Sequence, residues 1–591
     1  MNWDLSKLYS GFDDPKLIAD AGAAFEQVAS IRAMIAKLPG DAPAENLAAV
    51  VRAMQSAAGL QIKVSEFAYL TLAVDANCEP ARAFYSRVID LNAEWAQLNS
   101  ALSRYLGGAD DLEAQIESNS LLAEHAFMLR ELKKDAAHVI DPAVEPAVLK
   151  MQMTGGTSWE QLRDQLDSNL MIPFEQDGRE VQLPLSAIRG LANSPSADVR
   201  RRAYEAELAA YPRIEIPMAA CLNGIKGEAL TLCELRHYDS VLDTALEDAS
   251  RMDRATLDAL LSAMRKSLPM FRRYFRLKAR LLGYDGGLKF YDLCAPVGEA
   301  GQKYTLDEAR DMLVEVMGRF SPRMAGLIDR AFRERWIDAY PREGKQGGAF
   351  CSGVHPLGIS YVMTNFEGSY SSVSTLAHEL GHAYHSSCLN DASVLMCDYP
   401  MPLAETASIF NETLLMEKTL ETAGDATKLT LLEQQIGDAA QVVVDILSRY
   451  LFETEVVERR KDHPLSPREL CAIMLEAQKQ TYGDGLDPKF LHPYMWACKP
   501  HYYSTSIHFY NFPYAFGMLF GLGVYARYLE KGEAFLPEYD RLLAATGSGS
   551  VREVAASVGI DVADEAFWMQ SIRTLEEKVD AFERLASARL G

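Results

Sequence analysis

The chain has 591 residues, of which 48% are hydrophobic and 24% are charged, which is the composition of a globular protein and not of a disordered one. A chain of this length exceeds what one compact core supports, so we expect two or more large domains or lobes. The formal net charge of −23 argues against a nucleic-acid partner, because surfaces that bind nucleic acids carry basic patches.

Cysteine usage and apolar stretches indicate a cytoplasmic protein. The nine cysteines are scattered and odd in number, which does not indicate a disulfide framework. Residues 1–9 lack the basic region and apolar stretch of a secretory signal. The longest apolar stretch, 512–526, is too short to span a bilayer and contains three glycines. We therefore expect no membrane partner.

The N-terminal part is predicted to be a helical scaffold. Apolar residues recur there at three- and four-residue spacing among helix-favouring Ala, Leu, Glu and Arg. The isolated His125 and His138 are interpreted as structural. The expected helices cover residues 15–38, 42–74, 79–106, 110–138 and 143–153.

A β-hairpin is predicted at 171–185, where the Asp177-Gly178 pair separates two short alternating runs. We place a soft domain boundary near residue 195. Residues 1–195 then form an N-terminal helical lobe that includes the hairpin, and residues 196–591 form a catalytic region.

From residue 288 the pattern changes several times. Residues 289–296 are predicted to be extended, and a helix is expected at about 307–335. Two short strands, 344–351 and 358–365, precede the central motif. A strand edge at this place can pair with an extended peptide by β-augmentation. A plain packing hairpin is equally consistent with the sequence.

The central motif is His378-Glu-Leu-Gly-His382, within a predicted helix over 371–385. Residues four apart lie on one face of a helix, so both imidazoles project the same way, as a zinc ion requires. Glu379 lies beside the metal in this arrangement and can accept a proton from water. The pattern is typical of zinc hydrolases. A pair of ordinary helix histidines is the alternative.

A third metal ligand is sought on the following predicted helix, 403–417. Glu405 and Glu412 are seven residues apart and share nearly one face. Glu405 completes the two-histidine, one-glutamate set of a catalytic zinc, and Glu412 suits the orientation of a ligand imidazole. His385 is a rival ligand, but it lies a further turn along the motif helix, and the spacing that bends a helix toward a third histidine is absent.

Residues 494–516 gather two histidines and four tyrosines in an apolar segment: His501, Tyr502, Tyr503, His508, Tyr510 and Tyr514. A phenol or an imidazole can donate a hydrogen bond to the oxyanion of a tetrahedral intermediate. Aromatic core packing is the alternative, and it accounts for most of the six.

Three segments together resemble the thimet-oligopeptidase family of zinc metallopeptidases. They are Ala377-His-Glu-Leu-Gly-His-Ala-Tyr-His385, Ala404-Glu-Thr-Ala-Ser-Ile-Phe-Asn-Glu412 and the His/Tyr-rich stretch at 501–514. The opening segment 3–9, the hairpin at 171–185 and Gly347-Gly-Ala-Phe-Cys351 resemble its oligoendopeptidase F branch. The resemblance thus spans nearly the whole chain.

The resemblance implies a mainly α, two-lobed, thimet-oligopeptidase/neurolysin-like fold with a deep substrate channel and zinc on its floor. The predicted strands then form a small β-sheet beside the zinc helix. The resemblance also implies one zinc per chain, held by His378, His382 and Glu405, with Glu379 as general base. By the same resemblance, His501, Tyr510 and Tyr514 are expected to be the substrate-binding and transition-state donors.

The expected activity is zinc-dependent hydrolysis of internal bonds in short oligopeptides. Two alternatives remain at this point. A helical zinc carboxypeptidase shares the motif but needs a cationic group to hold a terminal carboxylate. A non-catalytic peptide-binding protein would leave Glu379 without a task. Monomer and dimer are both open, and so is the cleavage preference.

Overall fold

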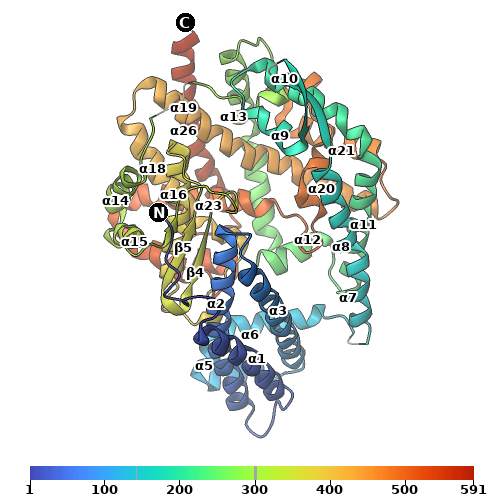
Figure 1. Cartoon of the computed structure of the whole chain (residues 1–591), viewed down its shortest axis with the longest axis vertical. Coiled ribbons are helices and arrows are strands. Elements are labelled where there is room, and N and C mark those ends of the chain that lie inside the picture. The colour runs from blue at the N-terminus through green and yellow to red at the C-terminus, as the bar shows by residue number, and fades with distance from the viewer. Residues whose placement is uncertain (142, 177, 299–301, 591) are drawn as a thin grey trace. The chain divides into compact units, whose positions relative to one another are not determined.

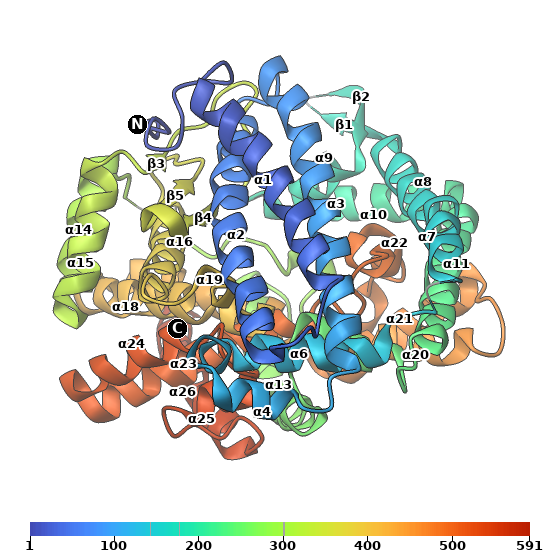
Figure 2. The ribbon, with the colours of Figure 1, turned by 90° about the horizontal axis from the view of Figure 1, so that it is seen from below.

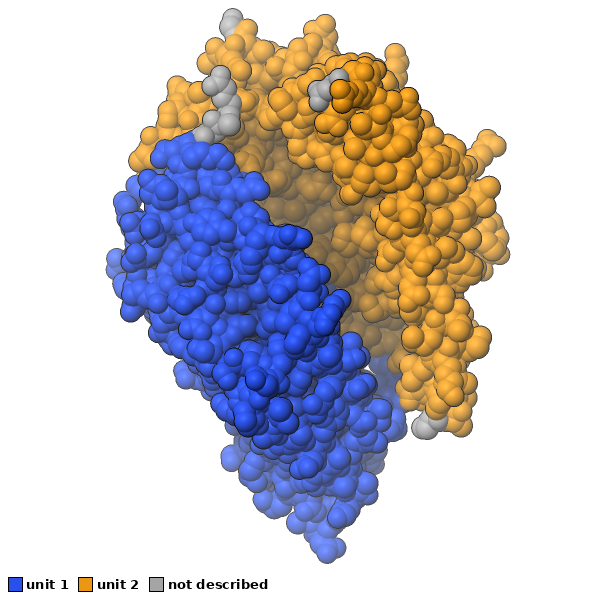
Figure 3. Space-filling model, in the orientation of Figure 1, with its two compact units in different colours: residues 1–139, 301–418, 527–560 blue, residues 140–300, 419–526, 561–591 orange. Residues whose placement is uncertain are grey.

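The computed structural model describes residues 1–141, 143–176, 178–298 and 302–590. Within these residues helices predominate and strands form two small sheets, which confirms the mainly α fold class. The chain divides into two compact units, coloured separately in Figure 3. Unit 1 combines Met1–Val139, Gly301–Lys418 and Arg527–Ile560, and unit 2 combines Ile140–Ala300, Thr419–Ala526 and Asp561–Gly591. The units interleave along the chain, so their bounds do not test a single boundary near residue 195. That boundary remains a prediction.

Unit 1 begins with three long helices that confirm the first three predicted spans. They are α1 (Pro15–Ile35), α2 (Pro43–Val74) and α3 (Glu79–Gly107), which pack side by side (Figure 2). Each has proline in its first turn. A backbone N–H at that place would have no hydrogen-bond partner within the helix, so proline's lack of one costs no hydrogen bond. Val28, Val51 and Leu98 are buried between them.

Two predicted helices of unit 1 are each interrupted, because a polar side chain caps a new helix inside the apolar pattern. The span 110–138 contains α4 (Leu112–Ser118), α5 (Ser120–Glu124) and α6 (Ala126–Asp135), and the Asn119 side chain accepts hydrogen bonds from the first turn of α5. The span 307–335 contains α14 (Leu306–Phe320) and α15 (Pro322–Arg333), with Ser321 capping α15. The prediction of one continuous helix was wrong in both places.

A three-stranded sheet with the order β3–β5–β4 lies in unit 1; Figure 1 labels β4 and β5, and Figure 2 labels all three strands. Strand β5 (Ile359–Met363) pairs parallel with β3 (Ile337–Asp338) and antiparallel with β4 (Phe350–Val354). Helix α16 (Tyr370–Cys388) packs against β4 and β5, which confirms a small sheet beside the motif helix. The first predicted strand, 344–351, was placed too early, because the segment around Gly344 and Gly348 turns with positive φ.

Unit 2 contains the predicted hairpin. Strand β1 (Met171–Gln176) pairs antiparallel with β2 (Arg179–Pro184), and Gln176 is opposite Arg179, which confirms the hairpin. Asp177 lies outside the described residues. Gly178 has a φ of 73°, which a two-residue hairpin turn requires. The segment 289–296, predicted to be extended, instead holds a 3₁₀ turn at Phe290–Asp292, where Arg200 Nε binds the buried Asp292 at 2.7 Å.

The rest of unit 2 is helical around an aromatic-rich core that includes Trp496, Tyr502 and Tyr503. In the described part of the chain, no helix is long and apolar enough to cross a membrane. The longer helices of this region are α8 (Gly156–Ser168), α10 (Ala197–Ala210), α11 (Glu215–Leu235), α13 (Arg254–Leu281), α19 (Asp425–Ala440), α20 (Ile446–Arg460), α21 (Pro467–Tyr482), α23 (Phe512–Lys531) and α26 (Glu565–Leu590). The residues of α23 after Ala526 belong to unit 1.

Candidate metal centre

The central motif lies on α16, as predicted. Ser369 caps this helix by accepting a hydrogen bond from the backbone N–H of Ser372. One turn separates His378 from His382, and their rings meet edge to face with centroids 4.8 Å apart. Their Nε2 atoms are 3.2 Å apart. Helical geometry alone therefore supplies two nitrogen donors that converge on one point.

Glu405 comes from a break between two helices and not from one continuous helix, so the predicted span 403–417 needs correction. Helix α17 (Met401–Ala404) ends at Glu405, whose φ of −82° and ψ of 3° leave the helical region, and α18 (Thr406–Thr422) begins immediately after it. Pro402, in the first turn of α17, is tolerated there as predicted.

Helix α16 lies very close to the start of α18, because Gly381 has no side chain. A Cβ at Gly381 would come within 2.6 Å of both the carbonyl oxygen of Ala407 and the Cα of Ser408. The side-chain amide of Asn411 on α18 also donates to the carbonyl of Ala377 on α16, at 3.2 Å. The close approach brings the Glu405 carboxylate to the two imidazoles.

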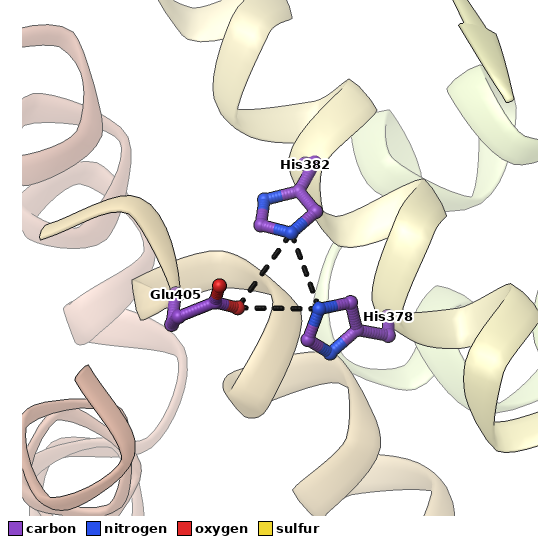
Figure 4. A group of neighbouring side chains, drawn as sticks. All are labelled: His378, His382 and Glu405. Atoms are coloured by element: carbon purple, nitrogen blue, oxygen red, sulfur yellow. Dashed lines mark hydrogen bonds and ion pairs between the residues drawn. The ribbon is translucent and has the colours of Figure 1, made fainter. Parts of the chain in front are cut away.

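Figure 4 shows the resulting triad of His378, His382 and Glu405. Glu405 Oε2 is 3.2 Å from His378 Nε2 and 3.6 Å from His382 Nε2. Atoms bound tetrahedrally at about 2.0–2.2 Å from a zinc ion lie about 3.3–3.6 Å apart. The three measured separations are close to that spacing, and the donor types are those of a catalytic zinc. The residues therefore fit the ion.

Two of the three donors are also held by neighbouring side chains. The Nδ1 of His378 is hydrogen-bonded to the Glu412 carboxylate. Ser408 Oγ donates to Glu405 Oε2 at 2.7 Å. Ligating histidines commonly donate their second N–H to a carboxylate or a carbonyl, which fixes the tautomer and the ring. The contact of Glu412 is the one predicted for it.

The electrostatics of the triad favour one proton on the His378 imidazole. Burial works against a charge on His378, but hydrogen bonds to Glu405 and Glu412 raise the pKa of its imidazole to about 10. Burial, together with the charge of His378, lowers the pKa of His382 to about 4. Burial disfavours the charge of Glu405 too, but the His378 hydrogen bond lowers its pKa to about 2. Zinc binding requires neutral imidazoles, so His378 must release its proton.

Glu379 lies on the same helix turn and is 6% exposed. Burial raises the pKa of its carboxyl to about 7; the charge of His378 opposes this shift, and the charges of Glu405 and Glu412 add to it. A carboxylate with a pKa near neutrality is suited to accept and then return a proton.

His385, the rival ligand, is occupied elsewhere in unit 1. Its side chain is fully buried, and its Nε2 lies 2.8 Å from Thr546 Oγ1. Its ring stacks on Tyr399 at 4.2 Å between centroids. This histidine has a packing role.

The six histidines and tyrosines of the segment 494–516 separate into two groups within unit 2. Tyr502, Tyr503 and His508 are buried, at 1%, 1% and 9% exposure, as core packing predicts. The other three form a row of rings: Tyr510 lies 5.0 Å from His501 and 5.8 Å from Tyr514 between centroids. His501, Tyr510 and Tyr514 are the three residues expected to act as donors, and that role remains a prediction.

The residue that sequence reasoning missed is Gly381. Glycine inside a helix lowers helix stability, and its presence in the middle of the motif helix was the available signal that another backbone approaches there.

Comparison with known proteins decides the family. The model described as "Peptidase family M3" matches residues 190–574, and the one described as "Oligopeptidase F" matches residues 108–171. The chain belongs to peptidase family M3. It is a metallo-endopeptidase of the oligoendopeptidase F branch, as the resemblance implied. The larger match contains the triad and the ring row, and the two matched ranges are separated by the hairpin.

Individual relatives agree with this assignment. The oligopeptidase PepF of Bacillus subtilis is 25% identical over 485 residues, which cover 80% of this chain and 71% of the relative. A solved structure from Chlamydophila abortus covers 99% of this chain and 98% of its own, with a TM-score of 0.84 and 23% identity. The oligoendopeptidase F structure from Enterococcus faecium covers 97% of this chain and 99% of its own, with a TM-score of 0.71 and 19% identity. Both structures share the fold.

Proposed function

We propose that this family M3 protein is a zinc-dependent endopeptidase that hydrolyses internal bonds of short oligopeptides. The convergence of two imidazole nitrogens and one carboxylate oxygen at 3.2–3.6 Å carries the proposal. His378, His382 and Glu405 hold one zinc ion per chain in this account. When bound, zinc supplies Lewis-acid chemistry, which activates water and polarises the scissile carbonyl.

Glu379 is the general base. It accepts a proton from the attacking water while the water oxygen bonds to the carbonyl carbon. It then gives this proton to the leaving amine as the carbon–nitrogen bond breaks. Its buried carboxyl, with a pKa of about 7, suits both transfers. Glu412 keeps the His378 imidazole oriented throughout.

Tyr514 or Tyr510, with His501, donates hydrogen bonds to the oxyanion. Tyr514 is 36% exposed, so it is accessible from solvent in unit 2, and Tyr510 lies between it and His501. Burial lowers the pKa of the His501 imidazole to about 4, so this imidazole is neutral at pH 7. A neutral imidazole is a suitable hydrogen-bond partner for the two tyrosines. Preorganised donors of this kind stabilise the transition state.

Oligopeptides are the proposed substrates, for two reasons. Relatives of the chain carry the names oligopeptidase and oligoendopeptidase. In addition, β4 is an outer strand of its sheet and packs beside α16, where an extended peptide can add as a further strand. The deep channel implied by the family resemblance belongs to this proposal and would admit unfolded peptides only. The nine cysteines are free thiols, which suits the proposed cytoplasmic location.

An end-blocked peptide of about ten residues tests the proposed cleavage. With zinc-loaded enzyme, mass spectrometry should find the two fragments produced by cleavage of one internal bond, because an endopeptidase needs no free terminus on its substrate. An intact blocked peptide, together with trimming of the unblocked one, would favour the carboxypeptidase alternative. Reduced, denatured casein tests the channel: cleavage as fast as that of the short peptide would contradict it. Folded proteins should resist, because unfolding costs about 5–15 kcal/mol.

A further inference from the structure

Phe509 has a left-handed backbone, with a φ of 52°. It belongs to the segment 504–511, which joins the 3₁₀ turn Pro500–Tyr503 to α23. Left-handed backbone is sterically unfavourable for a bulky L-residue and persists only where surrounding contacts determine it. The Phe509 side chain is 4% exposed, so it is anchored in the core of unit 2. The residue that follows it is Tyr510.

Two side chains of α20 hold the residues on either side of Tyr510. Glu453 Oε1 accepts a hydrogen bond from the backbone N–H of Phe509 at 3.1 Å. Arg449 Nη1 donates to the side-chain oxygen of Asn511 at 2.9 Å. Arg449 and Glu453 are four residues apart on one helix, so they project from the same face. One helix face therefore clamps the segment on both sides of Tyr510.

Each clamp residue is paired with an opposite charge. Lys226 Nζ lies 2.6 Å from Glu453 Oε1, and Arg449 Nε lies 2.8 Å from Asp445 Oδ2. All four residues are less than 9% exposed. Buried ion pairs add little to stability compared with apolar side chains of similar size, and their best-attested benefit is to specify one arrangement. These pairs specify the arrangement of the segment next to the row of His501, Tyr510 and Tyr514.

We propose that Arg449 and Glu453 are positioning residues that aim Tyr510 through Phe509 and Asn511. The inference rests on the proposed function, in which Tyr510 and Tyr514 serve as oxyanion donors. Such a donor is effective only if its direction is fixed before the reaction. The strained turn at Phe509, its buried side chain and the two hydrogen bonds from α20 together fix that direction.

Two double variants separate positioning from stability. Lys226→Met with Glu453→Gln removes both charges but keeps an oxygen that can accept from the Phe509 N–H. Lys226→Met with Glu453→Leu removes that acceptor as well. We expect the first to keep kcat within about threefold and the second to lower kcat at least about tenfold at unchanged KM, since small misplacements near the chemistry are costly. Equal kcat values in the two double variants would overturn the proposal.

Lys278 and Glu433 provide a matched control, because they form another buried ion pair of unit 2 at 2.6 Å. Lys278→Met with Glu433→Leu should change the melting temperature without lowering kcat. A comparable loss of kcat in this control would mean that losing any buried ion pair of unit 2 lowers activity, and it would overturn the proposal. Should the Glu453→Leu variant not fold, Asn511→Ala against Asn511→Asp makes the same comparison at the other end of the clamp. Only the Ala variant lacks an acceptor for Arg449, so a loss of kcat is expected in that variant alone, and equal kcat values would again overturn the proposal.

A spectroscopic readout is independent of the donor role. Fluorotyrosine at position 510 should give one sharp fluorine resonance in the wild-type protein and in the Glu453→Gln double variant. Broadened or multiple resonances are expected when the Phe509 acceptor or the Asn511 acceptor is lost, and one unshifted line in those variants would contradict the clamp. Normal turnover in both Tyr510→Phe and Tyr514→Phe would instead refute the proposed role of these tyrosines as oxyanion donors. The fluorine spectra do not test that role.

Discussion

Gly381 on α16 lies directly against Ser408 on α18: a Cβ on the glycine would come within 2.6 Å of the Cα of Ser408. Ser408 in turn hydrogen-bonds the carboxylate of Glu405. The spacing of the two helices and the position of the third proposed zinc ligand are thus set at one contact.

Replacing Gly381 with Ala is therefore expected to disturb the metal centre. The methyl group pushes α18 away, at a cost of about 1–3 kcal/mol in stability, and moves Glu405 from the histidines. Zinc affinity should fall by about 10–100-fold, the range seen when groups that orient ligands are altered. Gly326→Ala on α15 is the matched control, since its Cβ would meet no atom within 4 Å. Wild-type zinc affinity in Gly381→Ala would show that the contact is not needed.

Zinc binding should release about two protons near pH 8.5, one from His378 and one from the water that zinc activates, whose pKa falls to about 7. In the metal-free centre His378 has a pKa of about 10 and is protonated at this pH, whereas His382, with a pKa of about 4, and Glu405, with a pKa of about 2, have already lost their protons. Glu379, with a pKa of about 7, has lost its proton too. Calorimetry in buffers of different ionisation enthalpy counts the protons released. Release of only one proton, or of none, would mean that His378 is neutral before the metal arrives.

Glu379→Gln should keep the metal but lose turnover by at least about 10², because only the proton acceptor is removed. In the wild-type enzyme the acid limb of kcat/KM reports ionisation of Glu379. A bound dication favours the carboxylate, so this limb should lie below the metal-free pKa of about 7. Activity is lost as pH falls through it. Near-normal turnover of the Gln variant, or an acid limb well above pH 7, would point to another base.

Tyr514→Phe should lower kcat by about 10²–10³ with little change in KM, since an oxyanion donor acts mainly in the transition state. Steady-state kinetics on a short peptide measures both values. Tyr502→Phe is the control, because Tyr502 is buried in the core of unit 2. If Tyr514→Phe leaves kcat unchanged and Tyr510→Phe shows the loss, the role belongs to Tyr510.

Much of the candidate site could be predicted from local sequence, because its chemistry depends on spacing along helices. The two histidines and Glu379 are one turn of one helix, and a helical period is visible in sequence. Glu405 was predicted as a ligand, but on a continuous helix; the break after Ala404 that presents its carboxylate was not foreseen. The turn at Phe509 was hidden as well, since no glycine marks its positive φ.

Errors in the fold have a related cause. The interruptions at Asn119 and Ser321 arise from single side-chain hydrogen bonds to backbone N–H groups, which an apolar period does not reveal. The contacts of Arg449 and Glu453 with the segment 504–511 join residues more than fifty positions apart, beyond the reach of any local pattern.

The most direct test of the central claim is the zinc content of Glu405→Ala, measured by elemental analysis alongside turnover of the blocked peptide. The wild-type protein should hold one zinc ion per chain, and stripping this zinc with a chelator should abolish cleavage until zinc is returned. Glu405→Ala should lack both zinc and activity, whereas Glu379→Gln, prepared in parallel, keeps the zinc. Full zinc occupancy in Glu405→Ala would contradict the proposed metal centre.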